Sequence, residues 1–266
     1  MSSLSPTQPV DAQALDPRWK SLYKIGGVAA LIATVLFVGD IVVLITGNAM
    51  LSSANSWLGL MQTDRVAGLL QLFFTDLVGV ALLYPIFFAL YAALRRTNEV
   101  YVVFATGFAF VGIAIVLATN INYSLLYFND QYASAATAAQ RSQIVTAGES
   151  FVALLNGTGP LMGGLFIEGA FVIVSLIMLR SGVFSKRIAY LGLVAHGLDV
   201  VHSLGVLVLA PFFGMALAST IGALLLAIGG TLQLIWYPLV GRRLIQLGRG
   251  PTQEQPVTTT VPRFAS

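Results

Sequence analysis

The chain has 266 residues, of which 57% are hydrophobic and only 9% are charged, and its mean hydropathy is +0.84. Soluble globular domains carry about 25% charged residues, so this composition excludes a soluble protein and indicates an integral membrane protein. The sequence contains no cysteine, which excludes disulfides, thiolate metal ligands and cysteine nucleophiles.

Six stretches are long and apolar enough to cross a bilayer, which takes about 20 mostly apolar residues. They are residues 25–46, 66–94, 101–128, 160–179, 188–209 and 215–240. The second stretch is long, and Pro85 within it predicts a kink because proline lacks the helical hydrogen-bond donor. We therefore expect an all-α integral membrane bundle of six transmembrane helices, with the membrane domain covering residues 19–248.

Polar segments flank and interrupt this pattern. Residues 1–18 and 249–266 are polar and Pro-containing, which predicts two disordered tails, and the first of them lacks the features of a cleaved signal peptide. Residues 48–64 mix Trp and Leu with Ser and Asn, as expected of an interfacial segment. Residues 130–155 are rich in alanine and polar side chains and predict a surface helix, with Asn129 or Asp130 as its N-cap.

The basic residues predict an orientation. All but two of the 14 Lys and Arg residues fall before the first crossing, between the second and third, between the fourth and fifth, or after the sixth. The opposite loops hold only Arg65 and Arg141. Basic residues favour the cytoplasmic side of a membrane, so we expect both termini in the cytoplasm. The formal net charge of +3 is then a topology signal, and we expect no nucleic-acid partner.

Four carboxyl groups lie inside the apolar stretches: Asp40, Asp76, Glu168 and Asp199. An ionisable group at membrane depth costs several kcal/mol unless it is paired, hydrated or neutralised. No Lys or Arg lies at the same depth to pair with them. The helical rise places all four near the middle or in the outer half of the bilayer, so they are candidate sites for a proton or a ligand.

The two histidines of the chain flank one of these carboxyl groups. His196, Asp199 and His202 have i, i+3, i+6 spacing and share one side of the fifth crossing. Imidazole and carboxylate together suit a divalent transition metal, which makes these residues a candidate metal site. Two alternatives stay open at this point: a proton relay, and polar contacts that only hold the helices together.

Several segments resemble one known family. They are the opening WKSLYKIGGVAALI at 19–32, the turn YAALRR at 91–96, the Ala-rich segment before GTG at 157–159, and the loop LRSGVF at 179–184. These segments are similar to a bacterial family of uncharacterised multi-pass membrane proteins, domain of unknown function 4386. The resemblance implies a location in the bacterial plasma membrane, and it supplies no activity or catalytic residue.

Three classes of function fit these observations. The first is transport or binding of protons, cations or a small ligand through the intramembrane polar residues. The second is an intramembrane metal-dependent enzyme acting on lipid, and the third is a non-catalytic membrane subunit or scaffold. The expected partner is the lipid bilayer, together with a second copy of the chain or a membrane complex. Whether the protein is an enzyme stays open.

Overall fold

The computed structural model describes residues 17–46, 53–71, 74–120, 122–155 and 157–249, and all regular structure in these ranges is helical. A short 3-10 turn, η1 (Pro17–Trp19), leads into eleven α-helices. They are α1 (Lys20–Thr46), α2 (Ala54–Thr63), α3 (Arg65–Gln71), α4 (Phe74–Ala81), α5 (Leu83–Leu94), α6 (Glu99–Ala118), α7 (Asn122–Ser134), α8 (Ala138–Leu155), α9 (Thr158–Ser181), α10 (Lys186–Phe213) and α11 (Met215–Arg249). The all-α prediction is confirmed.

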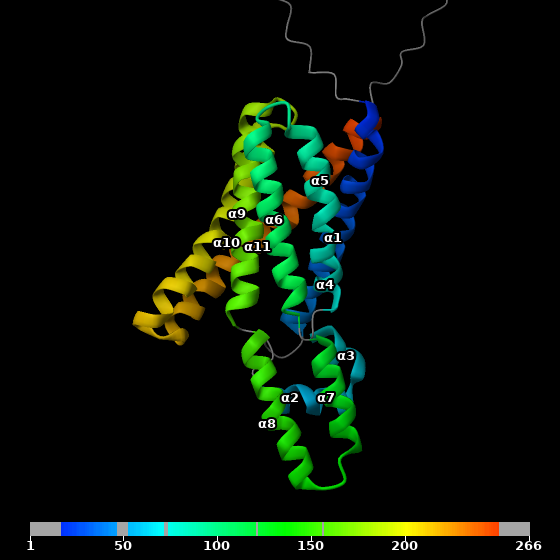
Figure 1. The fold of residues 1–266 in the computed structure, drawn as a ribbon, viewed down its shortest axis with the longest axis vertical. Helices are drawn as coiled ribbons and strands as arrows, with labels where there is room; N and C mark the ends of the chain where they lie inside the picture. The colour runs from blue at the N-terminus through cyan, green and yellow to red at the C-terminus, as the bar shows by residue number, and fades with distance from the viewer. Residues whose placement is uncertain (1–16, 47–52, 72–73, 121, 156, 250–266) are drawn as a thin grey trace, which may run out of the picture.

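Within the described ranges, six helical stretches are long and apolar enough to cross a membrane. They are α1, the end of α4 with α5, α6 with α7, α8 with α9, α10, and most of α11. By helix length and hydropathy the chain is a multi-pass membrane protein, as the composition predicts. In Figure 1 these helices form an elongated bundle in which α1, α5, α6, α9 and α11 run side by side.

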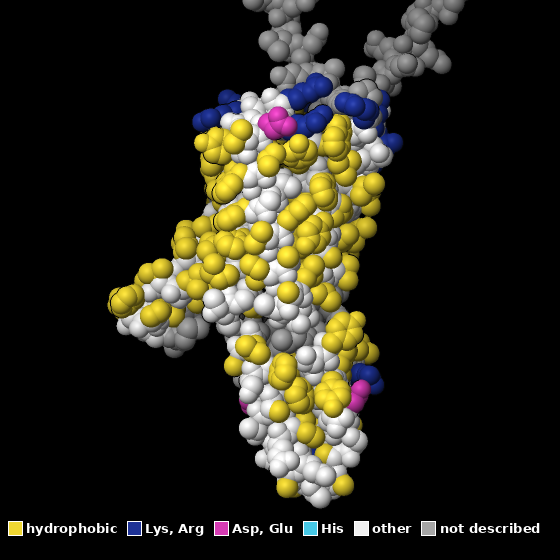
Figure 2. Space-filling model, viewed as in Figure 1, with side chains coloured by type: hydrophobic (Ala, Val, Ile, Leu, Met, Phe, Trp, Pro, Cys, Tyr) yellow, Lys and Arg dark blue, Asp and Glu magenta, His cyan; other side chains and the backbone are white. Residues whose placement is uncertain are grey.

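The start of α1 and the end of α11 lie at the same end of the bundle (Figure 1). Figure 2 shows that Lys and Arg side chains gather at this end, which we call the basic end. The two helices approach closely there. A Cβ added at Gly27 would lie 2.6 Å from the carbonyl oxygen of Gly241, and one at Gly241 would lie 2.8 Å from that of Gly27. Only glycine permits this backbone contact, which is a common way to join membrane helices.

The second crossing is interrupted at the predicted kink. α4 ends at Ala81 and α5 begins at Leu83, with Leu82 between them. Pro85 explains the position of this break, because the proline ring leaves no donor for the carbonyl of Ala81 and crowds it. Upstream, α3 is a separate short helix, so the predicted span of 66–94 is three helices rather than one.

The helices α2, α3, α7 and α8 form a small subdomain beyond the end of the bundle opposite the basic end (Figure 1). Its core is formed by Trp57, Leu58, Met61 and Leu125. Trp57 is fixed by a hydrogen bond from its Nε1 to the carbonyl oxygen of Gly68 at 3.0 Å. The segment 48–64 is therefore more than an interfacial loop: its helical part packs against α7 and α8.

The structure corrects the prediction of the surface helix in this region. The third stretch counts as one span by length and hydropathy, although α6 ends at Ala118 and α7 begins at Asn122. Asn129 and Asp130 lie inside α7 and do not cap the surface helix, which begins only at Ala138 as α8. The physical reason is that Asn129 finds a tertiary partner, since its Oδ1 accepts a hydrogen bond from Gln62 Nε2 at 2.7 Å.

The outer parts of α10 and α11 leave the bundle as a hairpin (Figure 1, yellow and orange). Gly214 makes the turn with φ of 85°, a conformation that favours glycine. Large apolar side chains on the hairpin are exposed, including Val208, Phe212 and Leu224. The hairpin therefore presents an apolar surface on its free side, as expected of a segment that lies in lipid.

Candidate functional site

Three neighbouring membrane helices bring together four polar side chains, which we call the polar cluster. Glu168 comes from α9, His196 and Asp199 from α10, and Gln233 from α11. His196 and Asp199 are three positions apart on one helix, so they face the same neighbours. Because α10 packs against both α9 and α11, residues that are far apart in the sequence meet at this level.

Hydrogen bonds connect the members of the polar cluster. His196 Nδ1 lies 2.6 Å from Glu168 Oε2. Gln233 Nε2 donates to Asp199 Oδ2 at 2.6 Å and to Glu168 Oε2 at 3.2 Å. A single amide nitrogen thus bridges two carboxyl groups, and one oxygen of Glu168 contacts both the imidazole and the amide.

Aromatic rings enclose the imidazole. The His196 side chain is fully buried, with 0% exposure. Phe171 stacks on it with ring centroids 4.4 Å apart, and Trp236 meets it edge-on at 4.6 Å. The indole is held in turn by a hydrogen bond from Trp236 Nε1 to the carbonyl oxygen of Ile188 at 3.1 Å. His196 is therefore fixed in orientation by packing on its faces and edges.

The polar cluster has two unlike sides. Phe171 follows Glu168 by one turn along α9, and Trp236 follows Gln233 by one turn along α11. Both helices run toward the basic end, so the aromatic rings form the side of the cluster that faces it. Asp199 lies one turn beyond His196 in the other direction. The carboxyl groups are thus on the side away from the basic end, where the hairpin leaves the bundle (Figure 1).

Two polar atoms of the cluster lack a hydrogen-bond partner within the described part of the chain. They are Nε2 of His196 and Oδ1 of Asp199, and both are buried. An unsatisfied buried polar atom costs about 1–3 kcal/mol, so such atoms in a folded protein call for an explanation. Oδ1 of Asp199 lies against Gly229 of α11, whose added Cβ would contact it. The absence of a side chain at Gly229 therefore leaves room for the carboxyl group of Asp199.

The predicted site residues divide into three groups. Glu168, His196 and Asp199 meet in the polar cluster. His202 lies farther along α10, where its ring packs against Gly222 of α11 and its buried Nδ1 has no partner among the described residues.

Asp40 and Asp76 belong to α1 and α4, but their side chains lie outside the described residues. Their part in any site stays a prediction.

The metal-site prediction gains no support from this geometry. Among the described residues, no group of three or more His, Asp or Glu side chains is arranged to hold a metal ion. Nδ1 of His196 is directed to Glu168, and the ring of His202 packs against Gly222 rather than joining the polar cluster. The metal site of His196, Asp199 and His202 therefore stays a prediction.

Gln233 is the member of the cluster that sequence reasoning missed. It lies within the sixth apolar stretch, two positions after Thr231. A glutamine inside an apolar span is a visible signal, because its amide must find partners in the absence of water. This signal is weaker than that of a carboxylate, because a neutral side chain costs less free energy at membrane depth.

Comparison with known proteins identifies one family. The model of the family described as "Domain of unknown function (DUF4386)" matches residues 21–237, which include all four members of the polar cluster. No curated protein matches the chain. No solved structure matches it either.

Proposed function

The chain belongs to the DUF4386 family, and we propose that it binds and releases a proton at the polar cluster, in the service of transport or binding of a small ion or ligand. The family description assigns no activity, so the proposal rests on the site itself. The observation that carries it is that the amide of Gln233 bridges the carboxyl groups of Glu168 and Asp199, at 3.2 and 2.6 Å.

When both carboxyl groups are ionised, their negative charges are poorly compensated. Coulomb repulsion between them grows as the surroundings become less polar, and the sequence places no Lys or Arg at their depth. One proton held within the cluster removes most of this repulsion. The imidazole of His196, 2.6 Å from Glu168, offers a further place for that proton.

The asymmetry of the cluster supports exchange from one side. The Glu168 side chain is 14% exposed, whereas His196 is fully buried behind Phe171 and Trp236. We therefore propose that protons enter at Glu168 from the end opposite the basic end. The imidazole receives them, and the aromatic rings close the path toward the basic end in the conformation described here.

The orientation is part of the same proposal. Both termini are proposed to lie in the cytoplasm, and the membrane is proposed to be the plasma membrane of a bacterium. The gathering of Lys and Arg at the basic end supports this. Reporter fusions in the 95–100 and 180–187 loops are expected to read cytoplasmic, and one near residue 140 is expected to read external. A cytoplasmic reading near 140 contradicts the orientation.

Infrared difference spectroscopy of the protein in lipid tests the proton site directly. Cycling the pH is expected to produce a C=O stretching band of a protonated carboxylic acid in the membrane interior. Glu168→Gln and Asp199→Asn should each change or remove this band, because they retain hydrogen-bonding groups but cannot titrate. Glu99→Gln is the matched control, since Glu99 is an exposed residue at the start of α6. Spectra of the two cluster variants that superimpose on the wild-type spectrum would contradict the proposal.

A further inference from the structure

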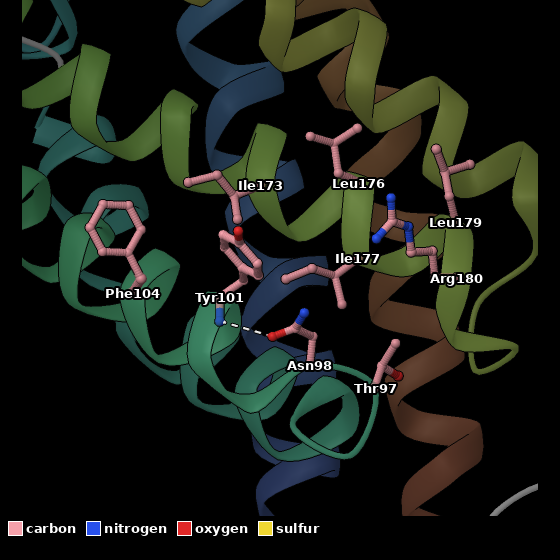
Figure 3. Close-up of a pocket in the computed structure, with 9 residues that line it drawn as sticks. All are labelled: Thr97, Asn98, Tyr101, Phe104, Ile173, Leu176, Ile177, Leu179 and Arg180. Atoms are coloured by element: carbon pink, nitrogen blue, oxygen red, sulfur yellow. Dashed lines mark hydrogen bonds between the residues drawn. The ribbon is translucent and has the colours of Figure 1, made fainter.

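A second site lies at the basic end, between the start of α6 and the end of α9. It is a pocket of about 580 Å³, open to the outside of the bundle. Figure 3 shows its lining side chains: Thr97, Asn98, Tyr101, Phe104, Ile173, Leu176, Ile177, Leu179 and Arg180. None of these residues belongs to the polar cluster, so the pocket is a separate site.

The walls of the pocket are mostly apolar, and two of their large side chains are exposed. Phe104 is 57% exposed and Leu176 is 46% exposed, although both belong to membrane-spanning helices. Together with Ile173 they make up an apolar strip of the pocket lining. A lipid hydrocarbon chain fits a strip of this kind, because it gains apolar contacts there and has no hydration to lose.

The mouth of the pocket carries hydrogen-bond donors. Figure 3 shows the guanidinium group of Arg180 and the amide nitrogen of Asn98 turned toward Ile177 from two directions. The amide oxygen of Asn98 is already used, because it accepts a hydrogen bond from the backbone N–H of Tyr101 at 3.2 Å. Within the described part of the chain, neither Arg180 nor the amide nitrogen of Asn98 has a hydrogen-bond or ion-pair partner.

We propose that this pocket binds an anionic phospholipid, with the phosphate at Arg180 and Asn98 and an acyl chain along Phe104, Ile173 and Leu176. Guanidinium is the side-chain group best suited to phosphate, since it offers several donors in one plane. Basic pockets between membrane helices near the cytoplasmic surface are suited to anionic headgroups. The apolar strip favours a lipid over a free anion, which would leave that strip uncovered.

The charges around the pocket agree in sign with this ligand. The basic end concentrates most of the Lys and Arg side chains of the described chain (Figure 2). The nearest acidic residue in the sequence is Glu99, next to Asn98 and exposed to solvent at the start of α6. It is absent from the pocket lining. The positive field at this end therefore attracts an anionic headgroup more strongly than a zwitterionic headgroup.

The test compares lipid binding by variants of the full-length protein in detergent. Thermal unfolding is followed while phosphatidylglycerol, phosphatidylcholine or inorganic phosphate is added. Phosphatidylglycerol alone is expected to raise the melting temperature, because a ligand stabilises the state that binds it. Arg180→Gln should weaken this response about ten-fold in lipid concentration, as expected for loss of a charged hydrogen bond. Arg187→Gln, an exposed basic residue at the same end and outside the pocket, should respond like the wild type.

A second variant separates lipid from small anion. Leu176→Trp fills the apolar strip at an exposed position, so it leaves the bundle packing intact while blocking the acyl chain. It should lose the phosphatidylglycerol response although Arg180 is present. The proposal is overturned if Arg180→Gln responds like Arg187→Gln, if Leu176→Trp keeps the full response, or if inorganic phosphate stabilises the protein as much as the lipid does.

Discussion

Replacing Gln233 by leucine distinguishes a charged polar cluster from one that only joins helices. The change removes the donor of two hydrogen bonds, one of 2.6 Å to Asp199 and one of 3.2 Å to Glu168. A hydrogen bond to a charged group contributes about 1.5–3 kcal/mol, whereas neutral polar contacts between membrane helices average about 0.6 kcal/mol. With one ionised carboxyl group in the cluster, we expect Gln233→Leu to lower the free energy of unfolding by about 3 kcal/mol.

The measurement is reversible unfolding in mixed micelles, titrated with a denaturing detergent and followed by circular dichroism. If Asp199 carries the ionised carboxyl group, the same change in an Asp199→Asn background should cost only about 1 kcal/mol, because the short bond then joins neutral groups. Thr231→Val is the matched control on the same helix, since the Thr231 hydroxyl donates to the carbonyl of Ala227 in its own helix, at 2.7 Å. It should change the stability by less than about 0.5 kcal/mol.

Two results would refute this reasoning. A cost below about 1 kcal/mol for Gln233→Leu would mean that the cluster is neutral and serves as ordinary helix packing. An equal cost in the wild-type and Asp199→Asn backgrounds would mean that Gln233 and Asp199 are not coupled. Either result removes the support that the bridging amide gives to the proton site.

The remaining predictions concern packing, the outer subdomain and metal. Gly192→Ala should destabilise the protein by about 1–3 kcal/mol because its Cβ would meet an indole nitrogen and a serine hydroxyl of neighbouring helices, whereas Gly197→Ala, with open space around it, should be neutral or stabilising in the same unfolding assay. Glu149→Ala removes the acceptor for the first backbone amide of α2 and should cost about 1 kcal/mol, seen as faster proteolysis of the outer subdomain; unchanged proteolysis argues against this role. If a metal binds at the fifth crossing, elemental analysis of purified protein should find the metal in stoichiometric amount. The double variant His196→Ala with His202→Ala should lose the metal. Metal-free wild-type protein whose stability is unaffected by chelator excludes the metal site.

The number of crossings could be predicted from the sequence because membrane insertion is decided segment by segment. Each span needs only its own length of apolar residues, without knowledge of its neighbours. The kink before Pro85 was predictable for the same local reason. The outer subdomain was not, since α7 and α8 carry mixed sequences whose partners lie far away in the chain. Asn129 looked like a helix cap and instead bonds Gln62, a contact that only the tertiary structure brings about.

The candidate site was predictable in part. Carboxyl and imidazole groups inside apolar spans are conspicuous because their burial costs free energy. Three of them, Glu168, His196 and Asp199, meet in the structure. The sequence could not tell that His202 packs apart from them. The i, i+3 and i+6 positions fan over about 120° of one helix side, and the placement of α11 decides which part of that side meets which partner. Gln233 was hidden for a different reason, since a neutral amide in a membrane helix is common as a packing group.

The hairpin of α10 and α11 makes the protein wider away from the basic end than at it (Figure 1). Near the basic end the helices are gathered closely, whereas the hairpin spreads sideways toward the other end (Figure 1). An inclusion that is broader in one leaflet fits best where that leaflet is stretched, which is on the convex side of a bend. We therefore expect the protein to favour curved membrane over flat membrane, which reconstitution into vesicles of different sizes would show.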